Sequence, residues 1–281
     1  MDVTTLTGKA VLVTGAASGI GQATALACAR RGGRLWICDL DASGLDTTAA
    51  EIRALGATVT AGRVDVADRE AMRVFADAVH AEVDAVDLLI NNAGVAVAGG
   101  FLHTTLDDWG WITSINLMGV VHGCHYFIPA MVTRGRGGHV VNVASSAGYV
   151  ASAALPAYSA TKFAVVGLSE ALRDELTPHG IGVTAICPGI VNTPITRSAR
   201  MRGPDDTPET RQRVIEIYQR RNYAPDRVAA GILRAVQHNR ALAPITAEAW
   251  AMYYLKRLSP SLMAWIGRAI QARARRSVEQ G

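Results

Sequence analysis

The chain has 281 residues, of which 49% are hydrophobic and 19% are charged. This composition excludes an intrinsically disordered chain, and the length suits one large α/β domain or two small ones. The formal net charge of +4 is uneven: after position 250, Lys256, Arg257 and four arginines between positions 268 and 276 are balanced only by Glu279. The rest of the chain is close to neutral and has no basic patch interleaved with aromatic residues, so no nucleic-acid partner is expected.

The four cysteines stand singly among apolar neighbours and form no CxxC pair, which indicates buried free thiols in a reducing compartment. The sequence starts without a basic and then apolar leader, so we expect a cytoplasmic location. Residues 10–29 and 140–161 lack charge over about the width of a membrane. Gly, Ser, Thr and Asn interrupt both stretches, and we expect a buried strand, turn and helix in each.

Short apolar runs alternate with segments of helical spacing along the first 190 residues. The apolar runs, which predict buried parallel strands, are residues 10–13, 35–38, 59–64, 86–90, 139–143 and 183–186. The helical segments between them are residues 20–31, 42–55, 68–83, 105–132 and 157–178. This alternation predicts one Rossmann-like α/β domain over residues 1–246, with a doubly wound parallel sheet and helices on both faces.

The last part of this domain is less regular. Residues 194–222 are charged and carry Gly203-Pro204 and Pro208, so they predict either a mobile substrate lid or a solvated helical insertion. A helix over 226–238 then leads to a seventh strand over 241–245, which Pro244 restricts to an edge of the sheet.

Three glycines, Gly15, Gly19 and Gly21, follow the first strand and open a helix. Glycine permits a tight turn, and the bare backbone lets N–H groups approach a pyrophosphate at the helix N-terminus. An ordinary strand–helix turn would explain the glycines alone, but their position at the first βα junction favours a dinucleotide.

Asp39 ends the second strand. A carboxylate there can accept hydrogen bonds from the adenosine ribose hydroxyls and would repel a 2′-phosphate. Neither Leu40 nor Ala17 supplies a cation for that phosphate, so we expect NAD rather than NADP. The alternative is that Asp39 caps the next helix, for which Asp41 is the better candidate.

Tyr158 and Lys162 lie four residues apart on a predicted helix, and Ser145 follows a predicted strand. A phenol has an unperturbed pKa of about 10, and an ammonium one helical turn away favours the phenolate. Tyr158 can then take a proton from an alcohol or give one to a carbonyl, while Ser145 holds the substrate oxygen. A YxxxK pair alone is common on exposed helices, but the charge-free stretch before Lys162 argues against an exposed position.

Together these motifs resemble the short-chain dehydrogenase/reductase family, in the branch with TGxxxGIG and YxxxK. The resemblance extends over roughly residues 9–245 and includes Asn91-Asn92-Ala93-Gly94, Asn116, and Pro188-Gly189 through Thr193. It implies that Tyr158 is the acid/base, that Ser145 polarises the substrate, that Lys162 also binds the nicotinamide ribose, and that Asn116 holds a water linking Lys162 to solvent.

The same resemblance implies a set of cofactor-binding residues. Asp65 and Val66 would touch the adenine, Asn92 would steady the central strand, and Val191 and Thr193 would reach the nicotinamide carboxamide. The full set is Gly15, Ser18, Gly19, Ile20, Gly21, Asp39, Asp65, Val66, Asn92, Ala93, Gly94, Tyr158, Lys162, Pro188, Gly189, Val191 and Thr193.

Several other residues have an ordinary structural explanation. His122 and His125 have no carboxylate nearby in sequence, so packing is expected rather than metal binding. His103 and Trp109 would either contact substrate or pack within a loop. By resemblance, the helices over 105–132 and 157–178 would pair in a homodimer or homotetramer.

Residues 247–281 depart from the family pattern as a basic helical extension. Its aromatic and aliphatic residues recur at helical spacing, and Ser259-Pro260 predicts a break between two helices. The extension would pack over the substrate cleft or a partner subunit, lie on an anionic membrane surface, or form a solvated end. We favour the first interpretation, which would make the substrate site apolar.

The function predicted from the sequence is hydride transfer between NAD(H) and a small-molecule secondary alcohol or ketone of lipophilic character. The alternative is a non-catalytic dinucleotide-binding sensor or scaffold with the same fold. The complete set of Asn116, Ser145, Tyr158 and Lys162 favours the enzyme, because a protein without turnover has no need of all four.

Overall fold

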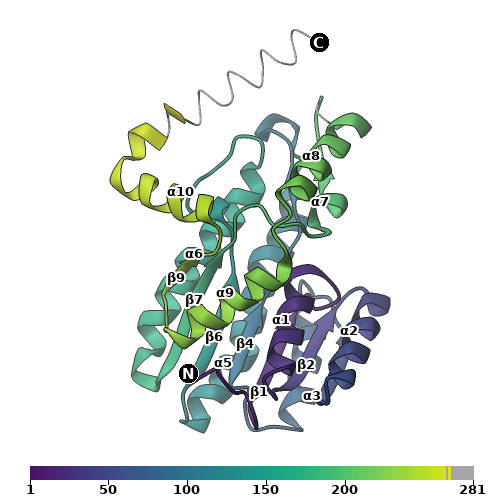
Figure 1. Cartoon of the computed structure of the whole chain (residues 1–281), viewed down its shortest axis with the longest axis vertical. Coiled ribbons are helices and arrows are strands. Elements are labelled where there is room, and N and C mark those ends of the chain that lie inside the picture. Colours follow the sequence, from purple (N-terminus) through teal and green to yellow (C-terminus); the bar gives the residue numbers. More distant parts are fainter. Residues whose placement is uncertain (205, 264, 267–281) are drawn as a thin grey trace.

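The computed structural model describes residues 1–204, 206–263 and 265–266, and its core is a seven-stranded parallel sheet (Figure 1). The strands are β1 Ala10–Thr14, β2 Arg34–Asp39, β3 Val59–Arg63, β4 Leu88–Asn91, β6 Gly138–Val143, β7 Ile181–Cys187 and β9 Leu242–Pro244. Their order is β3-β2-β1-β4-β6-β7-β9, so the chain builds outward from β1 and then crosses back to β4. The predicted doubly wound sheet is confirmed, including the edge position of the strand with Pro244.

β1 lies between β2 and β4, where Val11 pairs with Leu35 on one side and with Leu88 on the other. All five residues of β1 are buried. A strand with neighbours on both sides and helices on both faces has no solvated surface, which is why its sequence is a continuous apolar run.

Two layers of helices cover the sheet (Figure 1). One layer holds α1 Gly19–Ala29, α2 Ala42–Ala54 and α9 Pro225–Gln237, and the other holds α3 Arg69–His80, α5 Gly119–Arg134 and α6 Pro156–Leu176. Leu45 and Ile232 join the apolar core beneath the first layer, and Phe127 and Val165 join the core beneath the second. All four cysteines are buried and unpaired, as the sequence predicts.

Helices α2 and α3 start with side-chain caps, of which Asp41 is the one that the sequence predicts. Asp41 accepts a hydrogen bond from the Gly44 amide at 3.2 Å, and Asp68 accepts from the amides of Glu70 and Ala71 at 2.8 and 3.1 Å. Each cap satisfies backbone donors that lack a partner within the helix. Because Asp41 caps α2, Asp39 is left for another role.

The predicted helix over 105–132 is interrupted. It consists of α4 Leu106–Thr113, a π-helical turn Ser114–Met118, and α5. By length and composition, Leu106–Arg134 could cross a membrane, because an 18-residue window within it has a mean hydropathy of 1.3. However, 44% of the residues in that window are buried within the protein. Since α5 contacts α3, β4 and β6, its apolar face belongs to the core of the fold.

Residues 194–222 contain more regular structure than expected. The segment begins with α7 Ile195–Ser198 and continues into β8 Arg200–Met201, which pairs with β5 Val97–Ala98 in a second, two-stranded sheet. Helix α8 Pro208–Arg221 follows, at the upper right of Figure 1. The helical insertion is therefore present, whereas β5 and β8 were missed because two-residue strands leave no periodic pattern.

The C-terminal extension begins with α10 Ala247–Leu258, and a second helical stretch starts at Pro260, which confirms the predicted break. The Tyr149 hydroxyl donates to the Ala249 carbonyl at 2.7 Å, and the rings of Tyr149 and Tyr253 pack edge to face. Helix α10 is therefore attached to the segment that follows β6. The arginines between positions 268 and 276 and Ile270 lie outside the described residues.

The close packing of α5 on the sheet gives a stability prediction. A β-carbon on Gly123 would lie 2.0 Å from Oδ1 of the buried Asn91, whereas one on Gly110, in α4, would meet nothing within 4 Å. Gly123→Ala should therefore lower the free energy of unfolding by about 1–3 kcal/mol through overpacking. Gly110→Ala should leave it unchanged or raise it by up to about 1 kcal/mol through helix propensity. Urea unfolding of both variants measures this, and equal effects would contradict the packing argument.

Candidate active site

A cavity of about 630 Å³ opens at the carboxyl ends of the central strands. All the predicted site residues line it except Gly21 and Asn116. Residues that follow β1, β2, β3, β4, β6 and β7, together with Tyr158 and Lys162, thus meet in one crevice. It lies at the edge where doubly wound sheets bind ligands.

The glycine turn is held in shape by close contacts. Gly15 and Gly19 adopt φ angles of 65° and 58°, which L side chains rarely adopt. A β-carbon on Gly21 would lie 2.0 Å from the Gly15 carbonyl oxygen, so Gly21 lets α1 pack directly behind the turn without touching the cavity. The Asn92 amide donates to the carbonyls of Thr14 and Gly15, both at 2.9 Å, and so ties the turn to the end of β4.

The turn suits a diphosphate. Ser18 precedes α1 with no capping hydrogen bond from its side chain, and the first turn of α1 carries no acidic residue. The positive end of the helix dipole therefore faces the cavity without a carboxylate from the helix's own first turn, which suits an anion site. Together with the close backbone contacts around Gly15, this arrangement fits a nicotinamide dinucleotide.

Asp39 lines the cavity, and its carboxylate is oriented by the backbone. Its oxygens accept hydrogen bonds from the amides of Ala17 at 2.9 Å and Asp41 at 3.0 Å. The sheet also brings Arg63 of β3 beside Asp39 in register, a neighbour that the sequence order hides. The Arg63 guanidinium donates to the Leu40 carbonyl at 3.2 Å and does not line the cavity.

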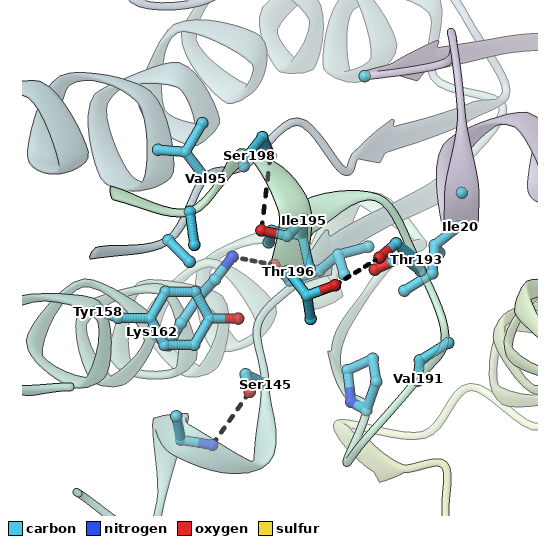
Figure 2. Close-up of a pocket in the computed structure, with 18 of the residues that line it drawn as sticks. Ile20, Val95, Ser145, Tyr158, Lys162, Val191, Thr193, Ile195, Thr196 and Ser198 are labelled. Carbon is cyan, nitrogen blue, oxygen red and sulfur yellow. Dashed lines mark hydrogen bonds between the residues drawn. The ribbon is translucent and has the colours of Figure 1, made fainter. Parts of the chain in front are cut away.

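Tyr158 and Lys162 lie together in the first turns of α6 (Figure 2). The Lys162 ammonium is 5.7 Å from the centre of the Tyr158 ring and donates to the Val143 carbonyl at 2.9 Å. Only 3% of Lys162 is exposed, so its side chain is almost completely desolvated. This agrees with the absence of other charged residues in the stretch of sequence before it.

The electrostatics differ from the sequence expectation. Burial raises the pKa of Tyr158 to about 12, and hydrogen bonding to Ser145 opposes this only in part. Burial also lowers the pKa of Lys162 to about 8. Lys162 faces the ring and a backbone carbonyl, so in the protein alone desolvation outweighs any stabilisation of the phenolate by the ammonium.

Ser145 leaves the end of β6 and begins a short 3₁₀ turn, Ser146–Gly148. Its hydroxyl oxygen accepts a hydrogen bond from the Ala147 amide at 3.1 Å, drawn as a dashed line in Figure 2. A hydroxyl that accepts a hydrogen bond still has one proton to donate, and in the cavity Ser145 can donate it to Tyr158 or to a bound oxygen.

Asn116 lies behind the cavity wall, fully buried in the π-helical turn. Its side chain donates to the Val95 carbonyl at 2.9 Å and accepts from the Val95 amide at 2.8 Å, which fixes the backbone after β4. A β-carbon on Gly94 would lie 3.3 Å from the Asn116 oxygen and 3.4 Å from the Lys162 nitrogen, so both polar groups border the same small space. The role of Asn116 in holding a water stays a prediction.

Sequence reasoning missed most of the wall opposite the nucleotide turn. Most of these residues have apolar side chains and come from several segments: Val95, Ala96, Ala98, Ile115, Val150, Ala151, Leu155, Ile190, Ile195, Ala199, Met201, Val214, Tyr218 and Met252. The lining also includes the uncharged polar residues Ser146, Ser152, Thr196 and Ser198. Tyr218 belongs to α8 and Met252 to α10. No local motif marks such residues, because only the folded chain brings them together.

The remaining sequence candidates pack structurally. Trp109 packs against Phe101 with ring centres 6.2 Å apart, and the His103 ring lies beneath Gly203; neither Trp109 nor His103 lines the cavity. The His122 ring nitrogen lies 2.8 Å from the Val66 carbonyl.

Comparison with known proteins gives a consistent result. Residues 9–203 match the family model described as short chain dehydrogenase. The protein named "Probable oxidoreductase EphD" of Mycobacterium tuberculosis strain H37Rv is 40% identical over 257 residues, which are 90% of this chain but 43% of that protein. The chain therefore spans less than half the length of EphD.

Two further comparisons cover both partners almost completely. The "Putative oxidoreductase SadH" of Mycobacterium tuberculosis strain H37Rv is 37% identical over 90% of this chain and 92% of its own length. A short chain dehydrogenase/reductase from Burkholderia phymatum, solved in complex with NAD, superposes with a TM-score of 0.83 at 31% identity, covering 93% of this chain and 96% of that one.

The buried lysine gives a pH prediction. Between pH 8 and its usual pKa of 10.5, Lys162 is deprotonated in the folded protein but protonated in the unfolded chain. The unfolded state then binds more protons, so the contribution of Lys162 to stability increases as the pH rises through this window and is lost as the pH falls through 8. Urea unfolding at pH 7.5, 9 and 10 should show the wild type gaining stability relative to Lys162→Met. A constant difference across this range would show that the ammonium is not desolvated.

Proposed function

The chain belongs to the short-chain dehydrogenase family, and from this premise we propose that it transfers a hydride between NAD(H) and a lipophilic secondary alcohol or ketone. The observation that carries this proposal is the convergence of Ser145, Tyr158 and Lys162 in the same cavity as the glycine turn. Family membership makes the protein an oxidoreductase, and the NAD-bound neighbour supports a nicotinamide dinucleotide as its cofactor.

The residues of the cavity divide between the parts of such a cofactor. The turn from Gly15 to Ile20 would hold the diphosphate, Asp39 the adenosine ribose, and Asp65 the adenine side. Val191 and Thr193 would hold the nicotinamide end. When bound, the nicotinamide ring supplies the hydride acceptor or donor.

The protein itself moves the proton. The Ser145 hydroxyl donates a hydrogen bond to the substrate oxygen and so stabilises negative charge developing there. In ketone reduction, the neutral Tyr158 phenol gives its proton to that oxygen; in alcohol oxidation, Tyr158 must first be the phenolate, which takes the proton of the alcohol. Since burial raises the pKa of Tyr158 to about 12, the phenol is ready as an acid, whereas action as a base needs positive charge nearby.

The substrate half of the cavity supports a lipophilic substrate. The only charged residues that line the whole cavity within the described part of the chain are Asp39, Asp65 and Lys162, all assigned above to the cofactor or the proton. A charged substrate group placed among the apolar wall residues would lose its hydration without gaining a partner.

Helix α10 contributes to this wall. Met252 lines the cavity, and Glu248, one turn earlier, forms an ion pair with Arg221 at the end of α8. The Glu248 carboxylate also accepts from the Ile190 amide at 3.4 Å. These contacts support the interpretation that the C-terminal extension packs over the substrate cleft.

The central test is turnover with NAD⁺ and a panel of secondary alcohols, followed by absorbance of the reduced nicotinamide. Catalytic efficiency should rise with the apolar surface of the alcohol, and Tyr158→Phe should lower kcat by at least about 10²-fold because the acid/base group is lost. NAD⁺ affinity, measured by thermal shift, should change little. Retained activity in Tyr158→Phe would exclude its acid/base role, and equal turnover of small polar and long apolar alcohols would exclude the substrate class.

Cofactor choice is tested at Asp39. Asp39→Ser removes the carboxylate that would repel a 2′-phosphate and leaves the Arg63 guanidinium of the next strand within reach of the same region. The ratio of kcat/KM for NADP⁺ to that for NAD⁺ should rise at least about tenfold, since juxtaposed like charges cost several kcal/mol. The matched control is Asp41→Ser, which keeps a helix cap. An unchanged ratio in Asp39→Ser would show that this carboxylate does not select the cofactor.

A further inference from the structure

A buried carboxylate outside the catalytic set lies behind the substrate wall. Asp108, in the first turn of α4, is 1% exposed and receives hydrogen bonds from three side chains. Arg202 forms a bidentate pair with it, with Nε 2.7 Å from Oδ2 and Nη2 2.8 Å from Oδ1. Arg200 donates to Oδ1 at 3.3 Å, and the Thr105 hydroxyl donates to Oδ2 at 3.0 Å.

This carboxylate is charged in the folded protein. The hydrogen bonds from Arg202, the largest cause, hold the pKa of Asp108 at about 2 against the effect of its burial. A bidentate arginine–carboxylate pair fixes orientation as well as distance, which a single hydrogen bond does not. The Arg200 guanidinium in addition lies 3.6 Å from the Trp111 ring centre, so it is held between Asp108 and an aromatic face.

Both arginines belong to the strip of chain that forms one side of the cavity. Arg200 opens β8, and Arg202 follows it directly. The Arg200 amide donates to the Ala96 carbonyl at 3.0 Å, and the Arg202 amide donates to the Ala98 carbonyl at 2.8 Å. The name β5–β8 ribbon is used below for residues 95–98 and 199–202.

The two faces of the ribbon meet different parts of the site. Val95, Ala96, Ala98, Ala199 and Met201 line the cavity, and three of these five residues are alanines. On the other face, Val97 is 1% exposed and packs in a cluster that includes Tyr158. The position of the ribbon thus sets the width of the substrate space.

Hydrogen bonding within the ribbon does not by itself fix its position. Two-residue strands give few ladder bonds, and the ribbon does not join the main sheet. The ion pairs to Asp108 connect it to α4, a helix of the catalytic body. Residues 200–202 of the segment predicted as a lid are therefore anchored to α4.

We propose that Asp108, with Arg202 and Arg200, is a positioning group that holds the β5–β8 ribbon and thereby sets which alcohols the site accepts. We call these three residues the Asp108 clamp. The clamp holds the ribbon in a position that leaves room in the cavity for a bulky apolar alcohol. A small alcohol bound at Ser145 and Tyr158 extends less far toward this wall than a bulky one, and the residues assigned to the cofactor belong to other segments of the cavity lining. This inference rests on the proposed function and adds a determinant of its substrate range.

The test compares Asp108→Asn with Asp107→Asn. Asp107 is the neighbouring residue in the same helical turn, is exposed, and makes no side-chain hydrogen bond in the described structure. The substrates are 2-propanol and a bulky cyclic secondary alcohol at saturating NAD⁺. Asp108→Asn should raise KM for the bulky alcohol and lower its kcat/KM by about tenfold to 100-fold, the size expected for a misplaced binding wall. For 2-propanol the loss should be several-fold smaller, NAD⁺ affinity should stay within about twofold, and Asp107→Asn should resemble the wild type throughout.

Two outcomes would overturn the proposal. One is an equal loss for both alcohols together with weaker NAD⁺ binding, which would mean general damage to the fold. The other is wild-type selectivity in a folded Asp108→Asn protein. If Asp108→Asn does not fold, Arg202→Met replaces it, because Asp108 then keeps Arg200 and Thr105 as donors.

A double variant adds an independent check. If Asp108 and Arg202 act as one clamp, Asp108→Asn combined with Arg202→Met should lose no more selectivity than the worse single variant, and additive losses would contradict a shared role. The clamp can also be tested without turnover, by the thermal shift that a bulky ketone causes in the NADH complex. If wild-type protein binds the ketone but turns over no alcohol, the proposed function fails while the clamp remains testable.

Discussion

The near-complete burial of Lys162 beside the partly buried Tyr158 is the constraint on which the site depends. Lys162 is almost fully buried, and its ammonium has one hydrogen-bond partner in the described structure, the Val143 carbonyl. Burial moves the pKa of the lysine down and that of the tyrosine up, so both side chains tend toward their neutral forms. Any positive charge brought into the cavity then acts through a medium of low dielectric constant, where its effect on the phenol is larger than in water.

The rest of the fold holds this pair in position. Strands β1, β2, β3, β4, β6 and β7 are parallel, so their carboxyl ends lie at the same edge of the sheet. The chain segments that follow β4 and β7 form the walls of the cavity above this edge. The wall formed by the β5–β8 ribbon is anchored through an ion pair to Asp108, whereas the wall from α8 and α10 is joined through Glu248 and Arg221 at the surface. A buried bidentate ion pair restricts the positions of its two partners more strongly than an exposed ion pair does. The ribbon wall should therefore move less than the wall formed by α8 and α10.

Sequence reasoning succeeded where local chemistry fixes local structure. The apolar runs marked the inner strands of the sheet, because a strand covered on both faces tolerates few polar residues. The run over 59–64 also forms a strand, but β3 lies at an edge of the sheet and is only partly buried, so the prediction of a buried strand there was wrong. Asp41 and Asp68 marked helix starts through the backbone donors that they satisfy. It failed where the deciding contacts lie far apart in the chain. The π-helical turn that holds Asn116 and the short strands β5 and β8 have no periodic signal, and the pKa of Tyr158 depends on burial that no sequence pattern reports.

The sequence by itself determined the doubly wound sheet, the glycine turn at its first strand, and the family to which the chain belongs, because each depends on residues close together in the chain. Only the tertiary structure decided that Gly21 acts from behind the turn, that Arg63 lies beside Asp39, and that α8 and α10 close an apolar wall over the cavity. The physical reason is that burial and ion pairing are properties of surfaces that meet only after folding. Asp108 illustrates this: in sequence it is one of two acidic residues at a helix start, and in the structure it is a buried partner of two arginines more than 90 residues away.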